Sequence, residues 1–196
     1  MHLIRESGQI RALRTLKRQA IVDILDATGP SSAAEIAALM GCAPDRLYYH
    51  LQRLTTVGLL KGRLAPHGEG RQSTVYALQK RQPRLLYVPG DRTNVTAVNA
   101  VVASMLREAA RSFRSALRPG IDTSSKRREI WAGRRVGWLT AVEREMLNRL
   151  LHRVIALFRT KRHPTDTARM YSLTFSLSPF RTARVAGHPR RRRRQG

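Results

Sequence analysis

The segment from Ser31 to Leu78 constrains the fold more than any other part of the chain, because helical apolar spacing and turn residues follow one another there in a fixed order. A first helical pattern begins at Ser32, where Glu35 completes a capping box, and it ends at Gly41. Its apolar surface is formed by Ala34, Ile36, Ala37, Leu39 and Met40. A second pattern begins at Pro44, which suits a first helical position because its missing N–H would be unpaired there anyway. Two short helices joined by a glycine turn are therefore predicted.

The second predicted helix, over residues 44–57, has two chemically different sides. Leu47, Leu51 and Leu54 recur at helical spacing and are expected to face the core. The other side carries Asp45, Arg46, Tyr49, His50, Arg53 and Thr56. These residues supply forked donors, amphipathic rings and hydroxyls, which suit contacts with DNA base edges and phosphates.

Two strand-like runs follow this helix, over residues 59–64 and 72–78, and the segment 65–71 between them is rich in turn formers. Leucines at helical spacing also occur by chance in all-α proteins, but a hairpin in this position favours a DNA-binding winged helix-turn-helix, with 65–71 as the wing. Its predicted DNA contacts are Asp45, Arg46, Tyr48, Tyr49, His50, Arg53, Thr56, Arg63 and Arg71. Base readout is assigned to three of these, Tyr49, His50 and Arg53, which are expected to share the solvent face.

Three parts of this segment resemble the arsenic-repressor-type (ArsR-like) winged-helix regulators. They are Leu47-Tyr48-Tyr49-His50-Leu51-Gln52-Arg53-Leu54, then Val57-Gly58-Leu59-Leu60, and the hairpin end Val75-Tyr76-Ala77-Leu78. The resemblance, which covers residues 10–80, implies that helix 44–57 enters the major groove and that the hairpin tip contacts the backbone or minor groove. One departure is Ala43, where relatives usually have a capping Ser or Thr, so about 1 kcal/mol of capping stabilisation is absent.

The composition favours a globular protein with a polyanionic partner. The 196 residues and a hydrophobic content of 42% suffice for a core, and 37 basic against 13 acidic residues give a net charge of +24. Most of this charge lies in the C-terminal half and the tail, so it does not by itself identify a DNA-reading surface. No run approaches the roughly 18 apolar residues of a membrane-spanning helix, and no signal-peptide core begins the chain. We therefore expect a cytoplasmic, nucleoid-associated protein that binds double-stranded DNA.

Neither metal binding nor catalysis is predicted. Cys42 is the only cysteine, so the Cys-x-Cys pair through which some ArsR-like relatives sense metals is missing, and the six histidines lack metal-ligand spacing. The chain also has no phosphate-binding glycine loop, nucleophile elbow or zinc-protease helix. We expect no cofactor and no enzymatic activity.

Apolar periodicity predicts further helices outside this segment. One continuous helix includes Ile10, Leu13 and Leu16 and ends near Ala27. The longest, Asn94–Arg118, has a stripe that is predicted to form part of a two-fold dimer interface. The stripe consists of Val95, Val98, Val102 and Met105. Its other side has arginines in a narrow arc, which form either a solvated face or a phosphate-contacting ridge. They are Arg107, Arg111, Arg114 and Arg118.

A later helix opens with a capping box at Thr140 and Glu143 and runs to about Phe158. Its apolar side, expected to pack against the long helix, consists of Val142, Met146, Leu150, Val154 and Leu157. Residues 119–137 are predicted to be a long mobile connection, although four apolar residues could hold it to the core. They are Ile130, Trp131, Val136 and Trp138. Alternating residues from Tyr171 to Leu177 predict a strand that pairs with Leu85–Val88.

The predicted fold class is α+β and mostly α, with an N-terminal winged helix-turn-helix and a C-terminal helical and β association domain. Residues 1–80 would bind DNA, 85–180 would form a dimerisation and candidate effector domain for an unidentified small molecule, and 181–196 a disordered basic tail. The predicted function is sequence-specific transcriptional regulation by a homodimer. The alternative is a non-specific nucleic-acid binder, nucleoid-associated or RNA-binding, that uses the arginines of the long helix and tail. The tail itself either contacts DNA phosphates or only increases solubility.

Overall fold

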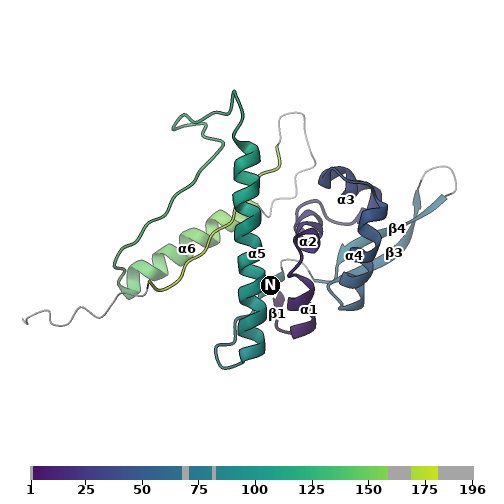
Figure 1. Cartoon of the computed structure of the whole chain (residues 1–196), viewed down its shortest axis with the longest axis horizontal. Coiled ribbons are helices and arrows are strands. Elements are labelled where there is room, and N and C mark those ends of the chain that lie inside the picture. The colour runs from purple at the N-terminus through teal and green to yellow at the C-terminus, as the bar shows by residue number, and fades with distance from the viewer. Residues whose placement is uncertain (1, 68–70, 81–82, 159–168, 181–196) are drawn as a thin grey trace, which may run out of the picture.

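The structure, a computed structural model, describes residues 2–67, 71–80, 83–158 and 169–180. Its helices are α1 (Ser7–Ala12), α2 (Leu16–Thr28), α3 (Ala33–Met40), α4 (Asp45–Thr56), α5 (Arg92–Ala116) and α6 (Ala141–Leu157). Its strands are β1 (His2–Ile4), β2 (Ser31–Ser32), β3 (Leu60–His67), β4 (Arg71–Leu78) and β5 (Pro83–Leu85). The protein is α+β and mostly helical, as predicted (Figure 1). No helix in the described ranges is long and apolar enough to cross a membrane. The predicted tail, 181–196, lies outside those ranges.

The predicted first helix is two helices. α1 ends at Ala12 and α2 begins at Leu16, so the prediction of one continuous helix is wrong. Side chains of α2 explain the break, because the Arg18 guanidinium donates to the Ala12 carbonyl and Gln19 Nε2 donates to Leu13 O at 2.6 Å. These bonds satisfy carbonyl groups that a continuous helix would have bonded to its own backbone.

Local signals set α3 as predicted. The capping box is confirmed, since Glu35 N donates to Ser32 Oγ at 3.3 Å and Ser32 N donates to Glu35 Oε2 at 2.6 Å. Gly41 ends the helix with a φ of 62°, in the left-handed region that favours glycine. The predicted apolar surface is only partly buried, because Ala34 and Leu39 are exposed. Both fall outside the arc that residues 33, 36 and 37 turn toward the core.

α4 buries the leucines that were predicted to face the core. Leu47, Leu51 and Leu54 are each 0% exposed and belong to the main apolar cluster. Burial of each leucine contributes about 1.5–3 kcal/mol, so the three together fix which side of α4 remains outside. The helix begins at Asp45, with Pro44 at its cap and no side-chain cap bond, one residue later than predicted.

β4 is the central strand of a three-stranded antiparallel sheet with the order β2-β4-β3. The hairpin of β3 and β4 pairs Leu60 with Leu78 and continues to His67 opposite Arg71, so most of the predicted loop 65–71 is strand. Pro66 is tolerated within β3 because β3 is an edge strand of this sheet. The two-residue strand β2, which the sequence did not reveal, joins the start of α3 to the hairpin.

The core continues beyond residue 80, the predicted end of the DNA-binding unit. β1 pairs in parallel with β5, and Ala97, Val98 and Val101 of α5 belong to the same apolar cluster as the leucines of α4. The predicted pairing of Leu85–Val88 with a strand at Tyr171–Leu177 is wrong, because β5 pairs with β1 and residues 171–177 form no strand. β1, near the N-terminus, thus occupies the place beside β5 that the sequence predicted for a strand at residues 171–177.

The C-terminal part of the described chain leaves much apolar surface open. α6 has the predicted capping box, with Glu143 N donating to Thr140 Oγ1 at 3.3 Å, but none of its residues is buried. The exposed side chains on its predicted packing side are Val142, Met146, Leu150 and Leu157. Trp131 and Trp138 are 72% and 90% exposed, so they do not hold the connection 119–137 to the core. In Figure 1, α6 lies on the opposite side of α5 from α4.

Candidate nucleic-acid interface

The side of α4 opposite its buried leucines is open to solvent. Tyr48 and Tyr49 are 53% and 68% exposed, although tyrosine rings are often packed when a fold offers them a place. The other predicted contacts exposed on this helix are Asp45, Arg46, Arg53 and Thr56. Core packing does not account for two open aromatic rings beside forked donors, which makes this side of α4 the candidate contact surface.

His50 departs from this pattern. Its side chain is half-buried, and its Nδ1 has no hydrogen-bond partner among the described residues. Burial, followed by the charges of Arg18 and Lys17, lowers the pKa of His50 from its ordinary value of 6.5. His50 therefore lies on the border between α4 and α2, not on the solvent face as predicted. Sequence spacing could not show this, because the first turn of α2 reaches that border only in the folded chain.

On its other border α4 meets the hairpin in an open groove of about 440 Å³. The groove is lined by Gln52, Thr55, Thr56, Gly62, Arg63, Leu64, Thr74 and Tyr76. Gly62 suits this place because a Cβ there would come within 3.1 Å of Thr74 Cγ2. Of the two predicted hairpin contacts, Arg63 is exposed and lines the groove. Arg71 pairs with His67 through the backbone, and its side chain is outside what the structure describes.

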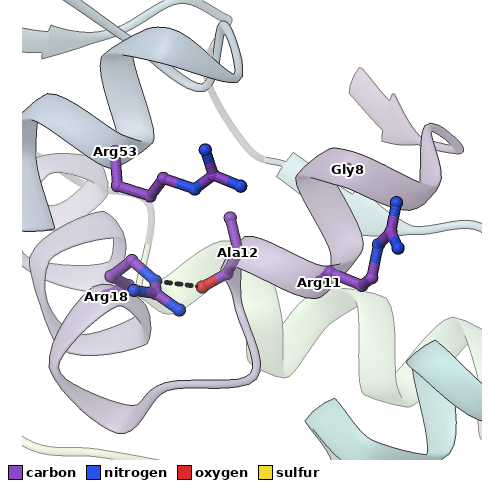
Figure 2. A pocket seen from close by; sticks show the side chains of 5 residues that line it. All are labelled: Gly8, Arg11, Ala12, Arg18 and Arg53. Atoms are coloured by element: carbon purple, nitrogen blue, oxygen red, sulfur yellow. Dashed lines mark hydrogen bonds between the residues drawn. The ribbon is translucent and has the colours of Figure 1, made fainter.

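The border of α4 toward α1 and α2 holds a pocket of about 280 Å³ (Figure 2). Its lining consists of Gly8, Arg11 and Ala12 of α1, Arg18 of α2 and Arg53 of α4. Figure 2 shows the side chains of Arg53 and Arg18 reaching toward Ala12 from their separate helices. The pocket therefore brings Arg53 together with Arg11 and Arg18, which lie far from it in the sequence, at the edge of the candidate contact surface.

Sequence reasoning missed several of these residues. Gln52 could have been found, because it lies three residues after Tyr49 and four before Thr56, on the same side of a helix. Arg11 and Arg18 carry no such signal, since their position beside α4 depends on the break between α1 and α2 and on how those helices pack.

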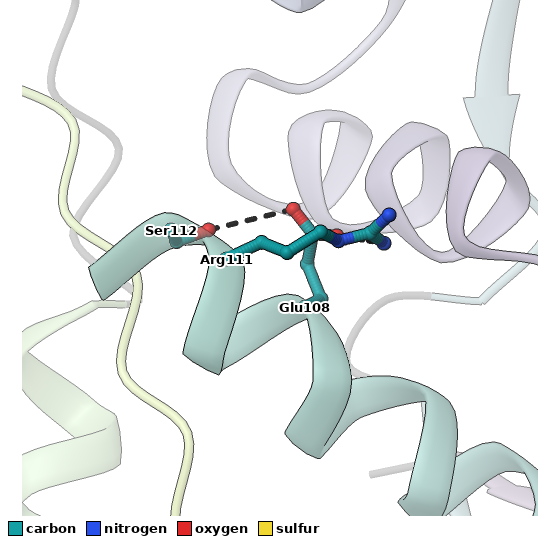
Figure 3. A network of polar contacts seen from close by, with 3 residues as sticks. All are labelled: Glu108, Arg111 and Ser112. Carbon is teal, nitrogen blue, oxygen red and sulfur yellow. Dashed lines mark hydrogen bonds and ion pairs between the residues drawn. The ribbon is translucent and has the colours of Figure 1, made fainter. Parts of the chain in front are cut away.

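The predicted arginine ridge on α5 is a separate surface. Arg111 Nη2 and Glu108 Oε2 form an ion pair at 2.6 Å, and Ser112 donates to Glu108 Oε1 at 3.4 Å (Figure 3). Both charged side chains are at least half exposed, so the pair contributes little to stability. α5 ends at Ala116, which leaves Arg118 outside the helix, and α1 and α2 lie between α5 and α4 (Figure 1). The structure thus favours the solvated face over a ridge that flanks α4.

A larger cavity, of about 520 Å³, lies between α2, α5, α6 and residues 173–175. Its apolar wall includes Val101, Val102, Met105, Leu151, Ile155 and Phe175. Asp23 and Asp26 lie on its rim, and although the Asp23 side chain is exposed there, desolvation by the surrounding protein and then the charge of Asp26 raise the pKa of Asp23 to about 6. Among the described residues, no group of His, Cys, Asp and Glu could hold a metal ion.

Residues 17–63 match the helix-turn-helix domain family. This helix-turn-helix domain comprises α2, α3, α4 and the start of β3. No curated protein matches the chain.

Solved structures that are similar to the chain include the following three. One is a probable transcriptional regulator from Pseudomonas aeruginosa, 17% identical, with 71% of this chain and 77% of that chain covered and a TM-score of 0.33. RV1404 from Mycobacterium tuberculosis is 18% identical, with 76% and 81% covered and a TM-score of 0.30. A MarR family transcription regulator is 16% identical, with 77% and 76% covered and a TM-score of 0.32. TM-scores this low support no conclusion about the chain. The assignment of a helix-turn-helix domain depends on the family match to residues 17–63 and on the geometry of α2, α3 and α4.

Proposed function

We propose that the protein is a sequence-specific, DNA-binding transcriptional regulator of the ArsR-like winged-helix type. The observation that supports this most is α4, which buries Leu47, Leu51 and Leu54 and exposes Tyr48 and Tyr49 within a matched helix-turn-helix domain. A helix held this way can enter the major groove of DNA without any change in the core. The hairpin of β3 and β4 is then the wing.

Within this proposal the outer side of α4 reads base edges. Tyr49 is the most exposed aromatic residue of α4 and stands beside Arg46, a forked donor suited to guanine. Asp45, Tyr48, Gln52 and Thr56 complete this surface. Arg63 of the groove and Arg71 near the hairpin tip are assigned to the DNA backbone, where they would set the register of α4.

We further propose that the working unit is a homodimer joined through α6. The predicted interface on α5 is partly occupied, because Val98 is buried in the chain's own core. α6 instead has no buried residue and exposes Met146 and Leu150 on a side that a second copy could cover. A two-fold dimer would place its recognition helices on half-sites about one DNA turn apart.

The cavity between α2, α5 and α6 is the proposed place for a small-molecule effector. It adjoins both the helix-turn-helix domain and the proposed dimer helix, so an occupant there would contact both parts. The residues on each side are Val22 and Asp23 of α2, and Leu151 and Ile155 of α6.

The second candidate is a non-specific nucleic-acid binder, which the net charge of +24 favours. Selection of bound sequences from random double-stranded DNA at physiological salt separates the two. The proposal expects a palindromic consensus, and a duplex of that consensus should bind far more tightly than its scrambled version. Equal affinity for both duplexes would favour the non-specific binder.

A further inference from the structure

The pocket at the edge of α4 collects positive charge without a counter-charge. Arg11, Arg18 and Arg53 line it, its other lining residues are Gly8 and Ala12, and no carboxylate is among them. None of the three arginines forms an ion pair with any residue that the structure describes. Like charges gathered in a concave site repel one another, so an anion in the pocket would relieve that repulsion.

Two of the guanidinium groups are held by hydrogen bonds to groups around the pocket. Arg18 donates to the Ala12 carbonyl and to Thr15 Oγ1, the latter at 2.5 Å. Arg11 Nε donates to Ser7 O at 3.2 Å. Each guanidinium has five N–H donors, so these bonds leave further donors for a ligand. Figure 2 shows the guanidinium group of Arg18 pointing toward Ala12 and that of Arg11 turned toward Gly8. An anion would therefore meet Arg18 already oriented, which reduces the entropy cost of binding, while Arg11 would turn to reach it.

The electrostatics of neighbouring groups agree with this picture. Burial lowers the pKa of Arg18, and the charge of Arg53 adds to that effect while Tyr49 opposes it. His50 lies close enough for Arg18 to lower its pKa, and its buried Nδ1 has no partner among the described residues. Among the residues that the structure describes, no ion pair offsets the positive charge of these three arginines.

We propose that Arg11, Arg18 and Arg53 form an oxyanion site that takes one phosphate group. Forked guanidinium donors match the geometry of phosphate oxygens and bind them with two parallel bonds. The site rests on the proposed function, because Arg53 of α4 lines it and it would hold a backbone phosphate at the rim of the groove that α4 enters. Arg53 then contacts phosphate in place of the base edge that the sequence predicted. The same chemistry would accept free phosphate, so the two sources need separate measurements.

Gly8 offers a way to block the pocket without removing an arginine. A Cβ built at Gly8 meets nothing within 4 Å, so a larger side chain fits there. Gly8→Glu would bring a carboxylate among the three guanidinium groups, and Gly8→Ala is its steric control. Ala110→Glu, at an exposed position of α5, makes the same change in net charge away from the pocket. All variants are compared as full-length proteins with wild-type far-UV spectra.

The first measurement is DNA affinity against salt on the consensus duplex and its scrambled version. Gly8→Glu should weaken binding to both duplexes by roughly tenfold, as expected for one lost charge-assisted contact. It should also lower the slope of log affinity against log salt by about 1. Gly8→Ala and Ala110→Glu should match the wild type. If the wild type discriminates between the duplexes and Gly8→Glu binds like it, the pocket does not hold a DNA phosphate while the proposed function stands. A loss confined to the consensus duplex would also overturn the site, because it would mean base readout.

The second measurement titrates inorganic phosphate into the protein without DNA and follows the imidazole signals of His50 by NMR. A saturable change and a rise in the pKa of His50 in wild type and Gly8→Ala, but not in Gly8→Glu, would support the site even if the protein proved unable to discriminate between DNA sequences. No response to free phosphate together with the tenfold DNA effect would identify the DNA backbone as the source. A free-phosphate response without a DNA effect would identify a phosphate ligand instead. No effect in either measurement would overturn the site.

Discussion

Tyr49 and Leu51 lie two residues apart on α4 and point in nearly opposite directions, so alanine at each position separates DNA reading from folding. Leu51 is 0% exposed, and Leu51→Ala should lower the free energy of unfolding by about 2–5 kcal/mol through lost burial and the cavity that remains. Tyr49 is 68% exposed, so Tyr49→Ala should change that free energy by no more than about 0.5 kcal/mol. It should instead reduce discrimination between the consensus and scrambled duplexes by about 1–2 kcal/mol, roughly 5- to 30-fold.

Urea unfolding followed by circular dichroism measures the first quantity, at one protein concentration because association would shift the apparent stability. Fluorescence anisotropy on the two duplexes at fixed salt measures the second. Tyr49→Phe is the matched control, because it keeps the ring and removes only the hydroxyl. The assignment of the two sides of α4 fails if Tyr49→Ala unfolds as easily as Leu51→Ala, or if it discriminates between the duplexes as well as the wild type does.

Three further predictions concern other parts of the chain. Met146→Glu on α6 should turn the proposed dimer into monomers in sedimentation, because a carboxylate would be buried against the second copy. A wild type that sediments as a monomer at every concentration would remove the basis for that interface. Because the pKa of Asp23 is raised to about 6 by desolvation and then by Asp26, the folded state keeps a proton between about pH 4 and 6 that the unfolded chain has released. The free energy of unfolding should therefore fall as pH rises through this window, and Asp23→Asn should flatten the fall, whereas equal slopes in both proteins would contradict the assignment. Truncation after Phe180 removes the arginines at 181, 184 and 190–194, and it should lower the salt slope by at most about 6 with an unchanged ratio of specific to non-specific affinity. A collapse of that ratio would show that the tail reads DNA.

Features encoded by residues three or four apart agree well between sequence and structure. The capping boxes at Ser32 and Thr140, the turn at Gly41 and the leucines of α4 all have this short range. The predicted hairpin also forms, and the structure sets its register with Leu60 opposite Leu78. Errors appear where a distant segment decides the outcome. Val142 belongs to the apolar side of α6 but stays exposed. Apolar spacing predicts that a helix has a side suited to burial, but it does not tell whether the same chain covers that side.

The sequence by itself determined the helix-turn-helix, because its caps, glycine turn and leucine stripe are local, and each is satisfied by neighbours along the chain or by any apolar core. Only the tertiary structure decided what surrounds α4. Arg18 bonds to the Ala12 carbonyl, which breaks the first helix, and the packing of α1, α2 and α4 then brings Arg11 and Arg18 beside Arg53. Repulsion between the three guanidinium groups opposes such a cluster, so the arginines themselves do not cause it. The cluster forms because the buried apolar side chains of these helices determine where their backbones lie, and no pattern within one helix records that position.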